Sequence, residues 1–402
     1  MSQATDKSVI ERPPVTADVE PQKSIGGIKI SMTNLRAYTM VFALIIVWLL
    51  FTWLTDGVFL EARNFSNLMR QTAVTGVLAV GMLMIIVTGQ IDLSVGSVVG
   101  LAGGISAVVL KWLGWGLVPS IAAAIVVGLV IGALQGTLVA YANIPAFIVT
   151  LGGLLVWRGI IKGVTKGNTI PIGLRAYKNI GQSYVAPAVG IAIAVLAIGA
   201  IIFLAVRRVR ARTSYGLGAP HIAGTILRIV LPSLVVLGFI LALNSYAGVP
   251  IPVIILVAIA LIGVLLTQNT TFGRYLYAIG GNPDAARLSG ISLRRHILMV
   301  FCIMGALAGI AGVIYTARVG SGAPDAGTLL ELDAIAACVI GGASLMGGRG
   351  TVFGACLGAL FMASLDNGMS LKNVENYIQD IVKGFILVVA VGLDMLGRRK
   401  SS

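Results

Sequence analysis

Apolar runs of about 17 to 24 residues recur along the whole chain, and each is close to the length at which an α-helix crosses a bilayer. No other feature restricts the fold as much. Only 11% of the residues are charged, against about a quarter in ordinary soluble domains. The pattern predicts an all-α polytopic membrane protein with about 10 to 12 transmembrane helices, broken or re-entrant segments included. Both termini are expected in the cytoplasm.

The chain divides into two tails and one membrane domain. Residues 1–37 are rich in Pro, Ser, Thr, Lys and acids and cannot build a core, so we expect a disordered cytoplasmic tail. Residues 38–397 form the predicted transmembrane domain, and the basic end of the chain places a short tail, 398–402, in the cytoplasm. Positive charge also favours the inside for the basic stretch 207–228 and for the loop 269–296.

The net charge of +14 is spread over short loops beside apolar runs rather than along one face. This distribution favours orientation in the bilayer over binding of nucleic acid. The basic loop Arg158–Lys178 is ambiguous, because counting segments places it outside whereas its charge favours the inside. If the run Pro145–Ile161 is re-entrant, the count changes.

Residues that carry catalysis or bind metal are scarce. Cys302, Cys338 and Cys356 each lie within an apolar run without paired spacing, which is typical of small buried side chains. His221 and His296 flank membrane segments and have no second ligand at a useful spacing. With no Ser/His/Asp, Cys/His or paired-carboxylate arrangement either, the sequence predicts neither an enzyme nor a metal site.

One apolar piece is too short to span the membrane. Ala334–Leu345 runs into the glycine-rich segment Gly341–Gly350, so we expect a half-helix or a broken helix that lines a cavity. The glycines do not follow the G-x-x-x-x-G-K-[ST] pattern of a phosphate-binding loop, and that pattern occurs nowhere in the chain. We therefore expect no ATP site on this chain.

A polar segment between two apolar runs carries the signals of a short helix outside the membrane. Asn282 can cap its first turn, Pro283 suits the first helical position, and Asp284 favours the positive end of the helix dipole. Gly290 supplies a stop. Ala285, Ala286 and Leu288 lie between these signals and could press into a groove of another protein. A solvated connector with ordinary caps is the alternative.

Polar residues at breaks in the apolar runs are candidates for lining a solute path. Asp92 is a lone acid in an apolar neighbourhood, which suggests function, although it could equally cap the next helix together with Ser94. Glu331, Asp333 and Asn367 also lie at such breaks. We expect these five residues to line the path.

Four segments resemble the signature segments of one family, in the same order. They are Ile91–Ser97, Pro145–Leu151, Ala278–Ile291 and Glu331–Gly342. The family comprises the bacterial ABC-importer permeases for monosaccharides, which include the ribose, galactose, arabinose and xylose permeases. The resemblance extends from about Leu35 to Leu396. Variable segments similar to the xylose branch are Arg70–Gly81, Lys111–Trp115, Ile180–Tyr184 and Ser364–Ser370.

The resemblance implies ATP-driven import of a monosaccharide, D-xylose in this branch, across a bacterial inner membrane by alternating access. It implies a periplasmic sugar-binding protein, a second copy of the permease and a cytoplasmic ABC ATPase, usually one fused double-cassette chain. ATP and Mg would be bound by that ATPase, with no cofactor on this chain; membrane lipid is a further partner. The implied ATPase-coupling loop consists of Gly280, Gly281, Asn282, Pro283, Asp284, Ala285, Ala286, Arg287, Leu288 and Gly290.

Two other classes remain open from the residues alone. An ion-coupled secondary sugar transporter could use Asp92, Glu331 or Asp333 as titrating groups. Against it, no basic partner for these acids is evident within the membrane segments, and the capped loop helix would have no task. A structural or receptor-like membrane protein would leave both that helix and the broken segment unexplained.

Overall fold

The computed structural model describes residues 24–25, 28–29, 32–215 and 222–399. Nearly all of these residues are helical, which confirms the predicted fold class. The expected tails, 1–37 and 398–402, lie largely outside the described residues, as does the middle of the basic stretch 207–228.

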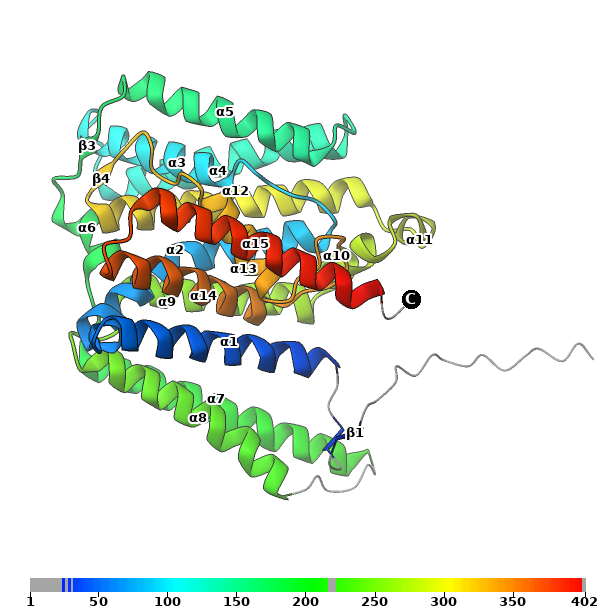
Figure 1. Cartoon of the computed structure of the whole chain (residues 1–402). Helices are drawn as coiled ribbons and strands as arrows, with labels where there is room; N and C mark the ends of the chain where they lie inside the picture. The colour runs from blue at the N-terminus through cyan, green and yellow to red at the C-terminus, as the bar shows by residue number, and fades with distance from the viewer. Residues whose placement is uncertain (1–23, 26–27, 30–31, 216–221, 400–402) are drawn as a thin grey trace, which may run out of the picture.

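Long helices make up the bundle (Figure 1). They are α1 (Met32–Leu54), α2 (Ala62–Val87), α3 (Val95–Lys111), α4 (Leu117–Ala140), α5 (Ala146–Thr165), α7 (Pro187–Ser214), α8 (Ile222–Asn244), α9 (Ile251–Asn269), α12 (Leu293–Val319), α14 (Val352–Leu371) and α15 (Asn376–Arg399). Short elements join them: the 3-10 turn η1 (Val58–Leu60), α6 (Arg175–Gln182), α10 (Thr271–Gly281), α11 (Pro283–Leu288), α13 (Leu330–Ile340), and the strands β1 (Ser24–Ile25), β2 (Ile28–Lys29), β3 (Ile170–Pro171) and β4 (Ser321–Gly322).

Within the described residues, 8 helices are long and apolar enough to cross a membrane, and Thr39–Leu54 and Val95–Lys111 are shorter apolar helices. The long helices lie side by side, so the bundle has two ends (Figure 1). One end holds α11, the start of α1 and the end of α15. The other holds α6, β3 and β4. The chain is a polytopic membrane protein.

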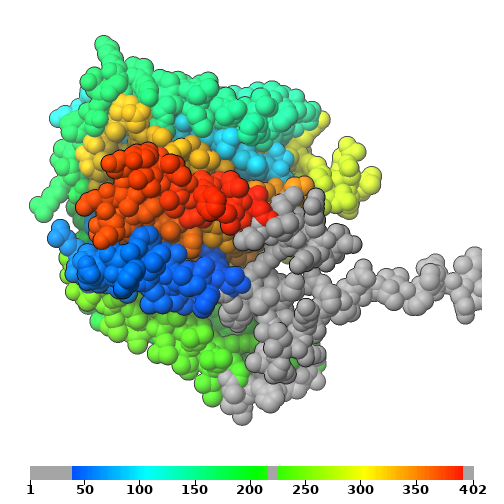
Figure 2. All heavy atoms as spheres, viewed as in Figure 1, coloured from blue at the N-terminus to red at the C-terminus, as the bar shows by residue number. Residues whose placement is uncertain are grey.

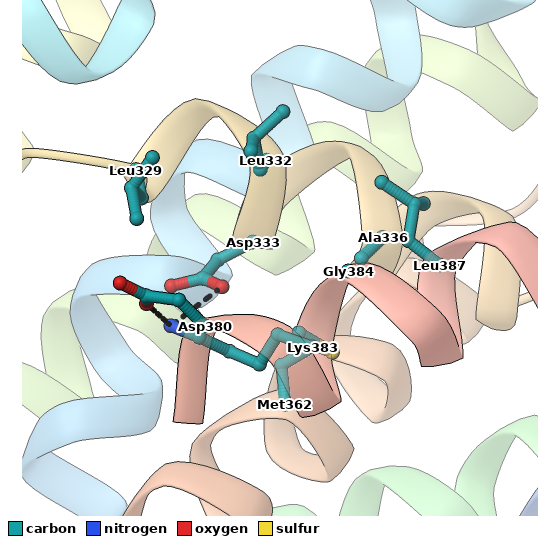
Figure 3. Close-up of a pocket in the computed structure, with 9 residues that line it drawn as sticks. All are labelled: Leu329, Leu332, Asp333, Ala336, Met362, Asp380, Lys383, Gly384 and Leu387. Carbon is teal, nitrogen blue, oxygen red and sulfur yellow. Dashed lines mark ion pairs between the residues drawn. The ribbon is translucent and has the colours of Figure 1, made fainter. Parts of the chain in front are cut away.

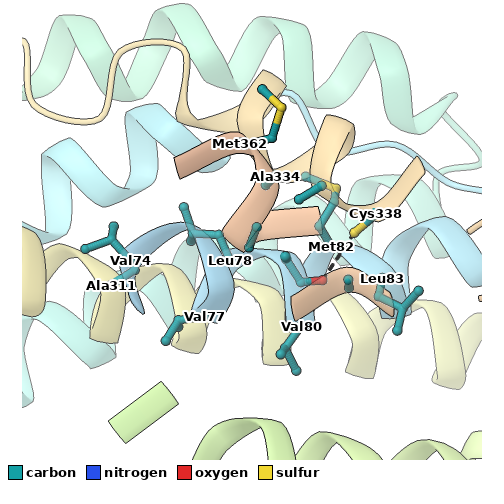
Figure 4. Close-up of a cluster of buried hydrophobic side chains, with 14 of the residues drawn as sticks. Val74, Val77, Leu78, Val80, Met82, Leu83, Ala311, Ala334, Cys338 and Met362 are labelled. Atoms are coloured by element: carbon teal, nitrogen blue, oxygen red, sulfur yellow. Dashed lines mark hydrogen bonds between the residues drawn. The ribbon is translucent and has the colours of Figure 1, made fainter. Parts of the chain in front are cut away.

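The core is built around α2, whose most apolar window is 89% buried inside the protein. Val77, Leu78, Met82 and Leu83 of α2 pack against α12, α13 and α14 (Figure 4). Cys338 of α13 donates a hydrogen bond from its thiol to the Ala79 carbonyl at 3.3 Å. A helix apolar on all sides is thus enclosed by other helices rather than by lipid.

Helices α4 and α12 pack through backbone. A Cβ atom added at Gly128 would overlap the Gly305 carbonyl, and one added at Gly305 would overlap the Gly128 carbonyl. Small residues let helix axes approach closely where lipid provides no hydrophobic drive between helices. This contact fixes α12, which runs directly from the α11 end of the bundle to the β4 end.

The pair α7–α8 forms a peripheral hairpin with only 11% of each apolar window buried. Two hydrogen bonds close the hairpin at one end, from the Val185 N–H to the Val249 carbonyl at 2.9 Å and from Asn244 Nδ2 to the Pro187 carbonyl at 3.1 Å. Phe239 of α8 packs edge-on against Phe65 of α2, with ring centroids 5.9 Å apart. Helix α7 continues to Ser214, so the basic residues from 207 to 212 are helical rather than part of a loop. Long Arg side chains favour the helix, and nothing in that stretch breaks it.

A short helix is present, but it spans Leu330–Ile340 and therefore begins four residues before the predicted segment Ala334–Leu345. Helix α13 has 11 residues, and at 1.5 Å per residue it is about 16 Å long, half the thickness of a bilayer core. Strand β4 and a series of turns over residues 323–329 lead into it, and the glycine-rich turn Gly341–Thr351 follows it. The polar Glu331 and Asp333 lie in its first turn.

Candidate functional site

The capped segment folds as its sequence predicts. Asn282 Oδ1 accepts a hydrogen bond from the Ala285 N–H at 3.0 Å, Pro283 occupies the first turn, and Gly290 has a φ of 82° after the last turn. Arg287 and Asp284 form an exposed ion pair at 3.9 Å, which contributes little stability. Helix α11 projects from one end of the bundle (Figure 1).

The side chains of α11 do not all face outward. Ala286 is 4% exposed and packs against its own chain, whereas Leu288 is 86% exposed. The helix turns Ala286 toward the bundle, and its expected contact with another protein stays a prediction. Leu288 offers the large apolar side chain that is available to a partner.

At the break between α2 and α3, Asp92 closes a local turn onto Ser94, and α3 begins after Ser94 without a side-chain cap. Asp92 Oδ1 accepts from the Ser94 N–H at 2.8 Å and from the Ser94 hydroxyl at 2.7 Å. The amide of Gln135, on α4, donates to Ser94 Oγ at 2.9 Å. Asp92 is 3% exposed and Ser94 is fully buried. Gln135 escaped the sequence reasoning because it lies mid-helix, away from any break.

Glu331 lies beside this break. A Cβ atom at Gly96 would overlap Glu331 Oε2, so the first turns of α13 and α3 touch. That oxygen is buried and has no hydrogen-bond partner within the part of the chain that the structure describes. The Nε1 atom of Trp157, on α5, is in the same situation. A buried acceptor and a buried donor are thus available to water or to a solute hydroxyl.

The segment before α13 is held by α5. Arg158 Nη1 donates to the carbonyls of Pro324 at 3.0 Å and Ala326 at 2.5 Å, and Lys162 pairs with Asp325 at 3.0 Å. Strand β3 pairs with β4 on the same side. The basic loop after α5 therefore lies with β4, at the end of the bundle opposite α11 (Figure 1), and α5 is a full-length helix rather than a re-entrant one.

Asp333 lies on another side of α13, in an ionic cluster with α14 and α15. Lys383 Nζ is 3.3 Å from Asp333, 3.3 Å from Asp366 and 4.0 Å from Asp380. The expectation that the acids lack a basic partner is wrong. Lys383 lies within an amphipathic helix that resembles any other with a charged face, so the sequence did not single it out.

The cluster borders a small cavity of about 50 Å³ that is partly open to the surface. Apolar side chains such as Leu332 and Met362 line the rest of it, and Figure 3 shows Asp333 and Lys383 facing one another between α13 and α15. Helix α15 itself lies on the surface of the bundle (Figure 2). Three carboxylates around one ammonium leave acceptor oxygens for hydroxyl donors.

Asn367 does not join the other path candidates. Its amide exchanges two hydrogen bonds with the Asn64 amide, at 2.8 and 3.0 Å, and Asn64 also donates to the Phe59 carbonyl. Both partners are satisfied, so this pair joins α14 to the start of α2. In the described residues no group of three or more His, Cys, Asp or Glu is placed to hold a metal ion.

Comparison with known proteins identifies the family. A family model described as "branched-chain amino acid transport system / permease component" matches residues 64–391. The chain belongs to this family of ABC permeases. It is therefore a membrane-spanning, non-catalytic component of an ABC transport system, a class whose members work with an ATPase and a solute-binding protein.

The permease has relatives with assigned substrates. The xylose transport system permease protein XylH of Escherichia coli (strain K12) is 50% identical over 368 residues, 92% of this chain and 94% of XylH. XylH of Haemophilus influenzae is 45% identical over 92% of this chain and 99% of the relative. The ribose import permease protein RbsC of Escherichia coli (strain K12) is 34% identical over 84% of this chain and 87% of RbsC. No solved structure matches the permease.

Proposed function

We propose that the permease imports D-xylose across a bacterial inner membrane. The observation that carries this proposal is the 50% identity to the XylH permease over 92% of the chain, against 34% to the ribose permease. This difference in identity, over nearly equal stretches, favours xylose over ribose as the substrate. The carboxylates and the lysine beside α13 offer hydrogen-bond partners to a ligand that presents only hydroxyls.

The transporter would contain two copies of the permease and an ATPase, most simply one fused double-cassette chain. ATP and Mg belong to that ATPase, and a periplasmic xylose-binding protein delivers the sugar. Helix α11, with residues Gly280–Gly290 around it, would meet the ATPase, since it is capped, projects from the bundle and exposes Leu288. The α11 end of the bundle then faces the cytoplasm.

Residues around the half-helix α13 would line the translocation path. Asp92, Ser94 and Glu331 lie on its α3 side, and Asp333 lies on its α15 side with Lys383. Irregular backbone at membrane depth is tolerated where it lines a cavity, and the segment before α13 is of this kind. Asn367 was expected here too; since its amide is committed to Asn64, we assign it to packing.

Uptake into liposomes tests the proposal. The permease, its ATPase and its xylose-binding protein are reconstituted with ATP inside the vesicles, and labelled D-xylose is followed. We expect uptake that requires ATP hydrolysis and exceeds ribose uptake at least tenfold. Uptake driven by a proton gradient without ATP would point to a secondary transporter instead. Equal uptake of ribose would contradict the assignment of xylose as the substrate, but not the assignment of the chain as an ABC permease.

A further inference from the structure

The glycine-rich turn that follows α13 has no role in the function as proposed so far, yet three separate backbone segments meet there. The Gly348 N–H donates to the Val87 carbonyl, at the end of α2, at 2.9 Å. A Cβ atom at Gly280, in the last turn of α10, would lie 2.6 Å from Gly348 N and would overlap the Val87 carbonyl. The ends of α2 and α10 and this turn are in direct backbone contact.

Glycine is required at this junction for two reasons. Gly347 and Gly348 have φ values of 87° and 72°, which side-chain-bearing residues rarely adopt. A Cβ atom at Gly347 would also lie 2.8 Å from the Gly280 carbonyl oxygen. Contacts between backbones leave no flexible side chain to absorb a movement, so a displacement of one segment is passed to the next.

The junction is continuous with both functional parts of the permease. On one side, Tyr277 of α10 donates its hydroxyl hydrogen to the Gly350 carbonyl at 2.8 Å, and α10 leads through Asn282 into α11. On the other side, the Ala343 N–H bonds the Cys338 carbonyl at 2.9 Å, so the turn caps α13. Helix α13 carries Glu331 and Asp333 at its far end.

We propose that the turn Gly341–Thr351 transmits the movement of α11 to the half-helix α13, with Tyr277 as a positioning residue. The inference rests on the proposed function, because it needs an ATPase that moves α11. Since Val87 is held by the same junction, the break at Asp92 moves with α13. The walls of the path on both sides of α13 are then displaced together by one push from the cytoplasm.

The test uses Tyr277→Phe, which removes one hydroxyl and keeps the ring. Its matched control is Tyr275→Phe, two residues earlier on the same helix. Both variants are assembled with the ATPase and the binding protein in liposomes, and the readout is xylose transported per ATP hydrolysed. Loss of one hydrogen bond is expected to lower this ratio about two- to tenfold in Tyr277→Phe. The Tyr275→Phe ratio, and the thermal midpoints of both, stay at the wild-type values.

A wild-type ratio in Tyr277→Phe, or an equal fall in Tyr275→Phe, would overturn the inference. So would failure of Tyr277→Phe to assemble, because the contact would then serve folding. If the wild-type complex itself does not couple ATP to xylose uptake, the proposed function is what fails.

A second pair of variants tests the backbone contact. Gly280→Ala places a methyl group against Val87 and Gly348, whereas Gly199→Ala, on α7, meets no atom within 4 Å. We expect a larger fall of the ratio in Gly280→Ala than in Tyr277→Phe, and none in Gly199→Ala. Wild-type coupling in an assembled Gly280→Ala complex would contradict the proposed transmission, and if that variant does not assemble, the tyrosine pair decides.

Discussion

A single lysine balances the acids at the α13–α15 contact. The side chains of Lys383 and Asp333 are 16% and 8% exposed, so their pairing is shielded from water far more than a surface ion pair. Removing one partner from such a pair is costly because it leaves the other charge buried and unmatched. Here the loss of Lys383 would leave three carboxylates close together.

We therefore expect Lys383→Met to lower the free energy of unfolding by about 3 kcal/mol or more. The measurement is the thermal midpoint of the purified permease in detergent, with the exposed Lys372→Met as control. Adding Asp333→Asn to Lys383→Met should recover part of the loss by removing one unmatched charge. Equal midpoints for the two lysine variants would show that the cluster does not stabilise the helix contact.

At the scale of elements, the short helices carry the specific features and the long ones hold them in place. Helix α11 has only 6 residues, yet its cap and its stop orient Leu288 outward and Ala286 inward. Helix α13 reaches only half-way through the bundle and is fixed at both ends, by α5 through the preceding segment and by the glycine turn. The position and orientation of each short helix thus depend on the segments that flank its two ends.

The exposure of Leu288 makes a prediction about the ATPase. Leu288→Ala should weaken its binding about tenfold or more, since a large apolar anchor in an interface commonly contributes above 1 kcal/mol. Ser289→Ala, at the next position, should bind as the wild type does. Affinity of the detergent-solubilised permease for the ATPase measures both. Unchanged binding of Leu288→Ala would mean that the ATPase meets a different surface.

The sequence predicted the local features of these elements well. The cap by Asn282 and the stop at Gly290 depend on neighbouring residues alone, as does the shortness of the half-helix. The features that it missed are contacts between distant segments. Asp333 and Lys383 are 50 positions apart, with all of α14 between them in the chain, and the inward face of Ala286 depends on how α11 lies against the bundle. Nothing in the local pattern encodes either.

At the scale of the whole molecule, the structure explains why charge and segment counting disagree for the loop after α5. Arg158 and Lys162 both bind the segment that leads into α13, so they serve packing rather than orientation. The positive-inside rule counts charges that are free to interact with the membrane surface. Two fewer such charges remove much of the conflict if, as we propose, the α11 end faces the cytoplasm and this loop lies outside.

A labelling experiment checks this arrangement. Single cysteines are placed at Ser292 and Thr169, which are both exposed. Ser292 directly follows the α11 loop and Thr169 directly precedes β3, and these two elements lie at opposite ends of the bundle. In intact cells, a membrane-impermeant maleimide should label Thr169→Cys and leave Ser292→Cys unlabelled until the cells are opened. The wild-type chain, with its three native cysteines, sets the background. The reverse pattern would invert the whole topology.

The hairpin α7–α8 has a consequence on the timescale of evolution. Its helices bury little surface against the body, which α8 contacts through side chains such as Phe239 against Phe65. Most side chains there face only lipid, so selection requires only that they stay apolar and that the helices stay long enough to span the membrane. Sequence should drift faster in this hairpin than in α2 or α12, and lineages could exchange, shorten or lose it while the transporting body remains the same.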